Sequence, residues 1–260
     1  MGSIVNAIDV LRYISQSHQP EGVTAISRAL SISPSSCFNI LKTLTNDGFI
    51  EFHPQTKTYA LGTEALRLAR RVMDENGALS YVRPHLHDIA TEFNVTSALW
   101  RLTARRRWVL VGFEESGALA RIHLSLGQRL PMFGGAVGRC AAAFSGLEAA
   151  RLKEEFAKVN WRRQPSAADH LAQVAAVAKA GWALDDNQFN HGVATVASPI
   201  LDSDGRVRYA IACTMFTKQH DSAVLRQIGV ASAALADRTS DHIYGGDRRR
   251  AAAALAASRS

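Results

Sequence analysis

Apolar residues recur at helical spacing in three segments at the start of the chain. In residues 4–16, Ile4, Ile8 and Ile14 fall on one face, which predicts an amphipathic helix. A short second helix is expected to begin near Thr24, a residue type that caps helix N-termini well. Ser33 and Pro34 suit the cap and first position of a third helix, over residues 34–47.

A short hairpin is predicted to follow these helices. Residues 49–52 and 58–61 have the composition of strands, and the segment between them is a turn. Three helices followed by a two-stranded hairpin is the order of elements in a winged helix-turn-helix. Residues 1–61 are therefore predicted to be a DNA-binding domain, and a further helical pattern predicts a linker helix over 62–77.

The pattern changes to mixed helix and strand after residue 77. Residues 78–244 are predicted to form an α+β domain, in which an antiparallel sheet is flanked by helices. The predicted strands are 96–102, 108–113, 122–124, 192–201 and 208–216, and the predicted helices are 79–93, 134–143, 147–158, 168–180 and 221–243. Residues 245–260, rich in Gly, Arg, Ala and Ser, are expected to be a disordered tail.

Composition narrows the class of protein but does not itself indicate DNA binding. Hydrophobic residues make up 47% and charged residues 20%, which is typical of a globular protein. The net charge is +7, yet residues 1–77 contain equal numbers of acidic and basic residues. The start of the chain lacks a signal-peptide pattern and no apolar run could span a bilayer, so a cytoplasmic location is expected.

Sequence motifs for catalysis, metals or cofactors are not found. The histidines do not form a metal-binding pair, and Cys37, Cys140 and Cys213 lack the spacing of a metal site or a disulfide framework. No nucleophile elbow is present, so an enzyme is not expected. Cys140 follows a glycine-rich helix start that could lower its pKa, although a buried structural cysteine is the simpler interpretation. The three arginines 105–107 form either an anion-binding patch or a solvated turn.

Several segments, taken in order, resemble the IclR family of bacterial transcriptional regulators. The segments are 7–11, 23–44, 48–51, 59–62, 129–132, 138–139, 181–186, 197–200 and 204–206. The resemblance covers about 1–244 and implies a winged helix-turn-helix and a GAF-like effector domain. It also implies homodimers that often pair into homotetramers, palindromic operator DNA as the partner, and repression of a catabolic operon more than activation.

The third helix is predicted to be the recognition helix, because its exposed face carries short polar groups. Backbone and hydroxyl groups in the first turn suit a phosphate, the amide of Asn39 suits an adenine edge, and Lys42 suits a phosphate. The alternative is an ordinary solvated helix face. With contacts from the second helix and the hairpin tip, the predicted DNA-binding residues are Arg28, Ser35, Ser36, Asn39, Lys42, Thr43 and Lys57.

The resemblance also implies where an effector would bind. In the family, the ligand lies against the inner sheet and the N-terminus of a helix, which here begins after Gly134. Free N–H groups there would suit a carboxylate, and Asp185, Thr195 and Thr214 would orient polar groups of the ligand. The implied effector-binding residues are Trp100, Phe133, Ala136, Val137, Asp185, Thr195, Ala212 and Thr214.

Two positions depart from relatives that bind small keto acids. Ala212 stands where some of those relatives have Ser, and Thr195 stands where they have Cys. Loss of a hydroxyl makes the site more apolar, and with Trp100 and Phe133 nearby this favours a larger or aromatic acid. The alternatives are that Asp185 only caps a turn and that the two aromatic residues belong to the core.

The sequence therefore favours a ligand-gated DNA-binding regulator over two other classes. One is an enzyme or small-molecule sensor on the GAF-like domain, with the N-terminal part as a partner-binding module. The other is an architectural DNA-binding protein without a ligand. The second domain is larger than dimerisation alone requires, which argues against the last class.

Overall fold

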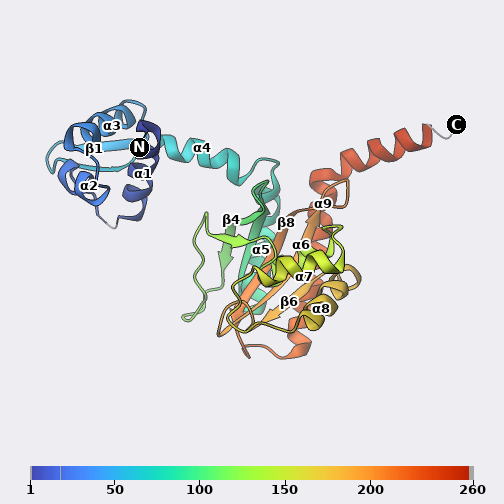
Figure 1. Cartoon of the computed structure of the whole chain (residues 1–260). Helices are drawn as coiled ribbons and strands as arrows, with labels where there is room; N and C mark the ends of the chain where they lie inside the picture. The colour runs from blue at the N-terminus through green and yellow to red at the C-terminus, as the bar shows by residue number, and fades with distance from the viewer. Residues whose placement is uncertain (1, 18, 258–260) are drawn as a thin grey trace. The chain divides into compact units, whose positions relative to one another are not determined.

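The computed structural model describes residues 2–17 and 19–257, which fall into two compact units (Figure 1). The first unit is Met1–Glu75 and the second is Asn76–Ser260. Each unit has a hydrophobic cluster of its own.

The N-terminal unit contains three helices and a hairpin, as predicted, and the predicted linker helix follows them. Its elements are α1 (Ser3–Gln16), α2 (Val23–Ala29), α3 (Pro34–Asn46), β1 (Ile50–His53), β2 (Thr58–Leu61) and α4 (Glu64–Met73). The two strands pair antiparallel, with Ile50 opposite Leu61. The core of the unit is formed by Val10, Ile14, Ile26, Cys37, Leu41, Ile50 and Tyr59. This order of elements is that of a winged helix-turn-helix.

The residues that were expected to cap helices do so at both ends of α3 but not at the start of α2. The Ser33 hydroxyl accepts a hydrogen bond from the Ser36 N–H at 3.3 Å, and Gly48 has the positive φ of 73° expected just after a helix. The predicted cap at Thr24 is wrong, because α2 begins at Val23, which follows Gly22 without a side-chain cap. On α1, Ile14 is buried, whereas Ile4 is 74% exposed and Ile8 is 43% exposed.

The C-terminal unit is built around a six-stranded antiparallel sheet with the order β5-β4-β3-β8-β7-β6. The strands are β3 (Thr96–Leu102), β4 (Arg107–Glu115), β5 (Arg129–Pro131), β6 (Ala183–Asp186), β7 (Val193–Leu201) and β8 (Val207–Phe216). The helices are α5 (Ala78–Phe93), α6 (Gly135–Ala143), α7 (Ala149–Ala157), α8 (Ala167–Ala180) and α9 (Ser222–Ala257). The fold is the predicted α+β class, with helices flanking the sheet.

The register of the strands assigns side chains to two covered faces. Ala98 and Ala212 are opposite one another on β3 and β8, and both belong to the cluster that includes α6. On the alternate face, the Ser97 hydroxyl donates to the Leu86 carbonyl of α5 at 2.5 Å, and Ser198 hydrogen-bonds Ser232 of α9 at 2.8 Å. One face is therefore packed against α5 and α9, and the other against α6 and its neighbours (Figure 1).

The structure corrects the sequence prediction at one edge of the sheet. Residues 122–124 do not form a strand; the edge strand is β5, in which Arg129 pairs with Val109. The Ile122 carbonyl accepts a hydrogen bond from the Thr96 hydroxyl at 2.8 Å, so a side chain and not a strand ladder holds this segment against β3. Strand β6 was not predicted at all.

The expected disordered tail is also wrong for most of its length. Helix α9 continues through Ala257, because the segment after residue 246 consists mostly of Ala and Arg, which are strong helix formers. Residues 258–260 lie outside the described part of the chain.

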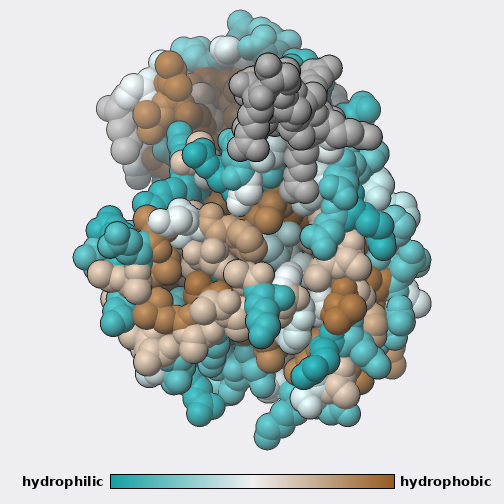
Figure 2. Space-filling model, turned by 90° about the vertical axis from the view of Figure 1, so that its right-hand side faces the viewer, coloured by the Kyte–Doolittle hydropathy of each residue, from teal (hydrophilic) through white to brown (hydrophobic). Residues whose placement is uncertain are grey.

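Apolar side chains are not confined to the interior. Figure 2 shows one face on which hydrophobic residues alternate with hydrophilic ones. Among the described residues, the exposed hydrophobic ones include Leu66, Leu119 and Val230. Within the same residues, no helix combines the length and apolar character needed to cross a membrane.

Candidate functional site

The recognition-helix face of α3 is open to solvent. Cys37 and Leu41 anchor the helix in the core, while Asn39, Lys42 and Thr43 are exposed on the other side. Thr43 donates its hydroxyl hydrogen to the Asn39 carbonyl at 3.0 Å, so the hydroxyl is an acceptor toward any partner. The Asn39 amide and the Lys42 ammonium have no side-chain partner among the described residues, and both remain available to an external ligand.

The first turn of α3 presents a second group of polar atoms. Ser35 and Ser36 are exposed, and the Ser36 hydroxyl accepts a hydrogen bond from Ser33 at 2.8 Å. Free backbone N–H groups in a first helical turn attract phosphate oxygens. The turn therefore combines hydroxyl and N–H groups at the positive end of a helix.

Two further cations flank this helix within the N-terminal unit. Arg28 lies in the last turn of α2 and is exposed. Lys57 lies at the tip of the β1–β2 hairpin, is exposed and adopts a positive φ of 54°. Neither side chain has an ion-pair partner in the described part of the chain. Their positions suit phosphate contacts on either side of a helix inserted in a groove.

The C-terminal unit contains a cavity of about 140 Å³ at the N-terminus of α6. Its walls come from α6, from β3, β7 and β8, from the end of β6 and from the segment 122–128. Seven of the eight predicted effector residues line it, namely Trp100, Ala136, Val137, Asp185, Thr195, Ala212 and Thr214.

The first turn of α6 lines this cavity and contains backbone N–H groups without a carbonyl partner among the described residues. The first backbone N–H of the helix with a carbonyl partner is that of Gly138, which donates to Gly134 at 3.0 Å. The N–H groups of Gly135, Ala136 and Val137 precede it, and all three residues line the cavity. Such groups and the helix dipole favour an anion. The arrangement can bind a carboxylate through backbone donors alone.

The opposite wall combines two hydroxyl groups with apolar surface. Thr195 and Thr214 lie opposite one another on β7 and β8, with their hydroxyl oxygens 3.5 Å apart. Ala212 and Trp100 supply the apolar part of the wall. Trp100 is only 4% exposed, so it serves both the core and the cavity.

A buried arginine engages the carboxylate of Asp185. Arg139 of α6 is fully buried, and its Nη1 donates to Asp185 Oδ2 at 2.7 Å. Its other donors reach Gln173 and Gln188, and the guanidinium lies 5.5 Å from the Trp161 ring centroid. A buried charge of this kind is stable only when it is paired and hydrogen-bonded. The ion pair neutralises the negative charge of Asp185, which lines the same cavity as the N-terminus of α6. Asp185 therefore does not oppose the binding of an anion there as an unpaired carboxylate would.

Asp185 also stabilises the turn that follows it. Its Oδ1 accepts a hydrogen bond from the Phe189 N–H at 3.0 Å. Asp185 therefore caps this turn in addition to pairing with Arg139, and its predicted ligand contact stays a prediction. The sequence did not reveal Arg139 as its partner, because the two residues are far apart in the chain and no local spacing connects them.

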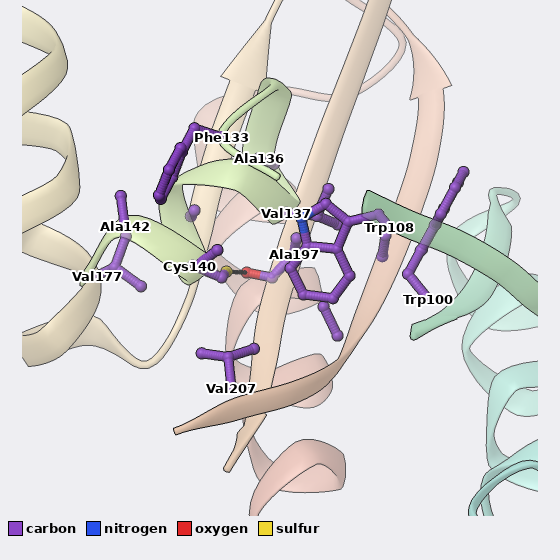
Figure 3. Packing of buried hydrophobic residues seen from close by; sticks show 14 of the residues in the cluster. Trp100, Trp108, Phe133, Ala136, Val137, Cys140, Ala142, Val177, Ala197 and Val207 are labelled. Carbon is purple, nitrogen blue, oxygen red and sulfur yellow. Dashed lines mark hydrogen bonds between the residues drawn. The ribbon is translucent and has the colours of Figure 1, made fainter. Parts of the chain in front are cut away.

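Phe133 does not line the cavity. It lies on the other side of the buried cluster from Trp100, as Figure 3 shows. Its ring is instead near Arg106, whose guanidinium carbon is 5.5 Å from the ring centroid. Phe133 was predicted to contact the effector, and the geometry does not support this contact. Gly134 lines the cavity at the start of α6, whereas Phe133 lines a separate hollow.

The structure adds residues that sequence reasoning missed. Ile122, His123 and Leu124 line the cavity as an irregular segment, which the strand predicted there obscured. Phe189 lines it as well, and its ring lies so close to Gly134 that a Cβ atom there would be only 2.8 Å from the ring.

The cysteines are all buried, and their surroundings agree with a structural role. Burial raises the pKa of the Cys140 thiol far above its ordinary value, and its Sγ lies 3.4 Å from the Ala197 carbonyl oxygen (Figure 3). Burial also raises the pKa of Cys213, to about 12. Of the arginine turn, Arg106 forms an ion pair with Glu155 at 3.3 Å.

Two family models match this chain and together cover most of it. One, described as the IclR helix-turn-helix domain, matches residues 3–54. The other, described as the C-terminal domain of the bacterial transcriptional regulator IclR, matches residues 71–240.

Curated relatives are named as regulators. The chain is 26% identical over 227 residues to the HTH-type transcriptional regulator XynR of Escherichia coli, covering 86% of this chain and 89% of the relative. It is 21% identical to the DNA-binding transcriptional repressor YiaJ of the same organism, covering 82% and 76%.

Solved structures of the same fold include the IclR protein of Thermotoga maritima, with a TM-score of 0.78, 18% identity and coverage of 93% and 98%. Another is an IclR homologue from Microbacterium hydrocarbonoxydans in complex with 4-hydroxybenzoate, with a TM-score of 0.72, 15% identity and coverage of 93% and 100%. The matching families and relatives are transcriptional regulators and not enzymes. The chain belongs to the IclR family of bacterial transcriptional regulators.

Proposed function

We propose that this regulator binds a palindromic operator as a dimer or tetramer and that a small carboxylic acid controls this binding. The main supporting observation is that the backbone N–H groups of Gly135, Ala136 and Val137 at the start of α6 have no carbonyl partner among the described residues, and that these three residues line a cavity of the C-terminal unit. A regulator needs such a site if a ligand is to shift its conformational equilibrium. The proposed DNA-binding domain is 1–61, with 62–77 as linker and 78–244 as effector domain.

The size and lining of the cavity favour a compact acid. Its volume of about 140 Å³ is close to the roughly 150 Å³ apolar cavity that holds benzene in another protein. A carboxylate would accept from the N–H groups of Ala136 and Val137, and a ring would lie against Trp100 and Ala212. The Thr195 and Thr214 hydroxyls would bind a polar substituent at the far end. A single-ring aromatic acid meets these requirements, and the relative crystallised with 4-hydroxybenzoate makes that acid a suitable first probe.

The proposed contacts to DNA use Asn39 for a base edge, with Lys42, Lys57 and Arg28 for phosphates. Ser35, Ser36 and Thr43 would add contacts around the helix start. Support comes from the exposure of this face and from the absence of ion-pair partners for the three cations among the described residues. Repression is the proposed direction of control, in keeping with the name of the YiaJ relative. The exposed Ile4 and Ile8 of α1 favour self-association of the N-terminal units.

A titration of fluorescently labelled DNA tests the proposal. The DNA would come from the region upstream of the gene, and anisotropy would be followed at several salt concentrations, with and without 4-hydroxybenzoate, benzoate or pyruvate. Saturable binding that exceeds binding to scrambled DNA, and that changes with one acid, is the expected result. Equal binding to both DNAs, unaffected by any acid, would contradict the proposal.

The variant Thr214→Val tests the cavity without altering the DNA-binding unit. It removes a hydroxyl that lines the cavity and keeps the shape of the side chain. We expect DNA affinity in the absence of acid to be unchanged and the response to 4-hydroxybenzoate to require more acid. An unchanged response would place the acid elsewhere.

A further inference from the structure

A second hollow of about 350 Å³ lies in the C-terminal unit and is lined in part by Phe133, which does not line the proposed effector cavity at the start of α6. The two hollows share no lining residue. The first turn of α6 borders the effector cavity, whereas Ala141, in the second half of the helix, borders the second hollow. The second hollow is therefore a separate place in the fold.

The floor of the second hollow is apolar and aromatic. It is formed by Met132, Phe133, Phe144 and Leu147, together with the ends of β3 and β8. Phe133 is only 4% exposed, so its ring is fixed in the core and does not turn out to solvent. A rigid aromatic floor favours a flat, apolar ligand, because two rings gain attraction beyond the area they bury.

The rim of the hollow carries positive charge. Arg106, Arg206 and Arg208 line it, and no acidic residue does. Arg106 is less available to a ligand, because it already pairs with Glu155 and lies over the Phe133 ring. Arg208 is 3.8 Å from Asp202. The Arg206 guanidinium is exposed and has no ion-pair or hydrogen-bond partner among the described residues, so it is free to bind an anion.

We propose that this hollow is a second binding site, for aromatic organic anions. The ring system of the ligand would lie against Met132, Phe144 and Leu147, and its carboxylate or sulfonate would bind the Arg206 guanidinium. Arginine suits this role because its planar group presents two parallel donors to such an anion. The volume of this hollow exceeds that of the cavity at the start of α6, which leaves room for an anion of two rings.

The test uses the full chain and the probe 8-anilinonaphthalene-1-sulfonate, an aromatic sulfonate whose fluorescence rises in apolar surroundings. Fluorescence and calorimetric titrations would give the affinity and the stoichiometry. We expect one probe per chain, with affinity that falls as salt is added. The Arg206→Gln variant should bind about two- to fivefold more weakly, the range expected for loss of one exposed charge contact.

Three matched variants separate the possible outcomes. Leu147→Trp fills the second hollow and should abolish binding, whereas Ala212→Leu fills the effector cavity and should leave probe affinity unchanged. Arg162→Gln removes an exposed arginine elsewhere and should have no effect. Circular dichroism establishes that each variant is folded; if Leu147→Trp is not, Arg206→Gln against Arg162→Gln still decides.

Two results would overturn the proposal. One is a probe that is displaced by Ala212→Leu and indifferent to Arg206→Gln, because it would then occupy the effector cavity. The other is binding that is absent, or equally affected by Arg206→Gln and Arg162→Gln. Neither result bears on DNA binding, which is measured separately, so failure here leaves the proposed function intact.

Discussion

His170 is a buried histidine that the fold holds in its neutral form. It is 2% exposed, its ring stacks on Phe156 at 4.4 Å, and its Nδ1 has no hydrogen-bond partner in the described part of the chain. Burial, and secondly the charge of Arg139, lower its pKa from 6.5 to about 4. Protonation of His170 therefore opposes folding.

This residue predicts a loss of stability in mild acid. The unfolded chain binds a proton at His170 below about pH 6.5, whereas the folded chain does so only near pH 4. Its contribution is thus fully present above pH 6.5 and is lost as the pH falls toward 4, by up to about 3 kcal/mol. Urea unfolding at pH 7.5, 6 and 5 measures it. The His170→Phe variant should lose less stability between these values than the parent; equal losses would contradict the assignment.

Asn39 gives a prediction for DNA binding at a single position. Because its side chain is exposed and has no side-chain partner among the described residues, Asn39→Ala should change the free energy of unfolding by less than about 0.5 kcal/mol. Operator affinity should fall about five- to a hundredfold, the range for loss of a bidentate base contact. Asn46→Ala, at the exposed end of the same helix, is the matched control. Equal effects of the two changes would remove Asn39 from the readout.

At the scale of elements, α6 depends on a close approach to the loop before it. A Cβ atom on Gly138 would lie 2.1 Å from the carbonyl carbon of Phe133, which is backbone and cannot move alone. Gly138→Ala should therefore displace the helix start, lower stability by about 1–3 kcal/mol and weaken the binding of 4-hydroxybenzoate. Gly117→Ala is the control, since nothing lies within 4 Å of its Cβ position. Thermal unfolding measures the loss of stability, and calorimetric titration measures the loss of affinity for 4-hydroxybenzoate. If Gly138→Ala and Gly117→Ala behaved alike, the prediction would be contradicted.

Elements with strong local signals could be predicted from the sequence, and those determined by distant contacts could not. Ser33, Pro34 and Gly48 define α3 because caps and a positive φ act within one helical turn. The edge strand β5 was missed because only three residues form it and its pairing with β4 decides its place. Seven residues that line the cavity at the start of α6 were named from the family resemblance, whereas the Arg139–Asp185 pair could be identified only from the fold.

At the scale of the whole molecule, the two units should unfold in separate steps. Each has its own hydrophobic cluster, and the helix α4 between them contributes exposed residues such as Leu66 and Leu68. We expect two transitions by differential scanning calorimetry. A ligand of the C-terminal unit at one hundred times its Kd should stabilise only one of them, by about 2.7 kcal/mol.

Two variants assign these transitions. Ser33→Ala removes the cap of α3 and should lower only the transition of the N-terminal unit, by about 1 kcal/mol. Thr214→Val should reduce the effect of 4-hydroxybenzoate on the other transition. A single transition that both changes shift together would mean that the units unfold as one.

Because all three cysteines are buried, the rate at which each thiol reacts with a reagent depends on how often the structure opens around it. A thiol must become a thiolate in contact with water before it reacts with an alkylating reagent such as iodoacetamide. Cys37 lies in the N-terminal core, whereas Cys140 and Cys213 lie in the C-terminal one. The rate at which each thiol is labelled, resolved by mass spectrometry of its peptide, therefore times the opening of each unit separately, with no foreign label introduced. Operator DNA should slow the labelling of Cys37, and an effector should slow the labelling of Cys140. One sample would therefore report DNA binding to the N-terminal unit and effector binding to the C-terminal unit.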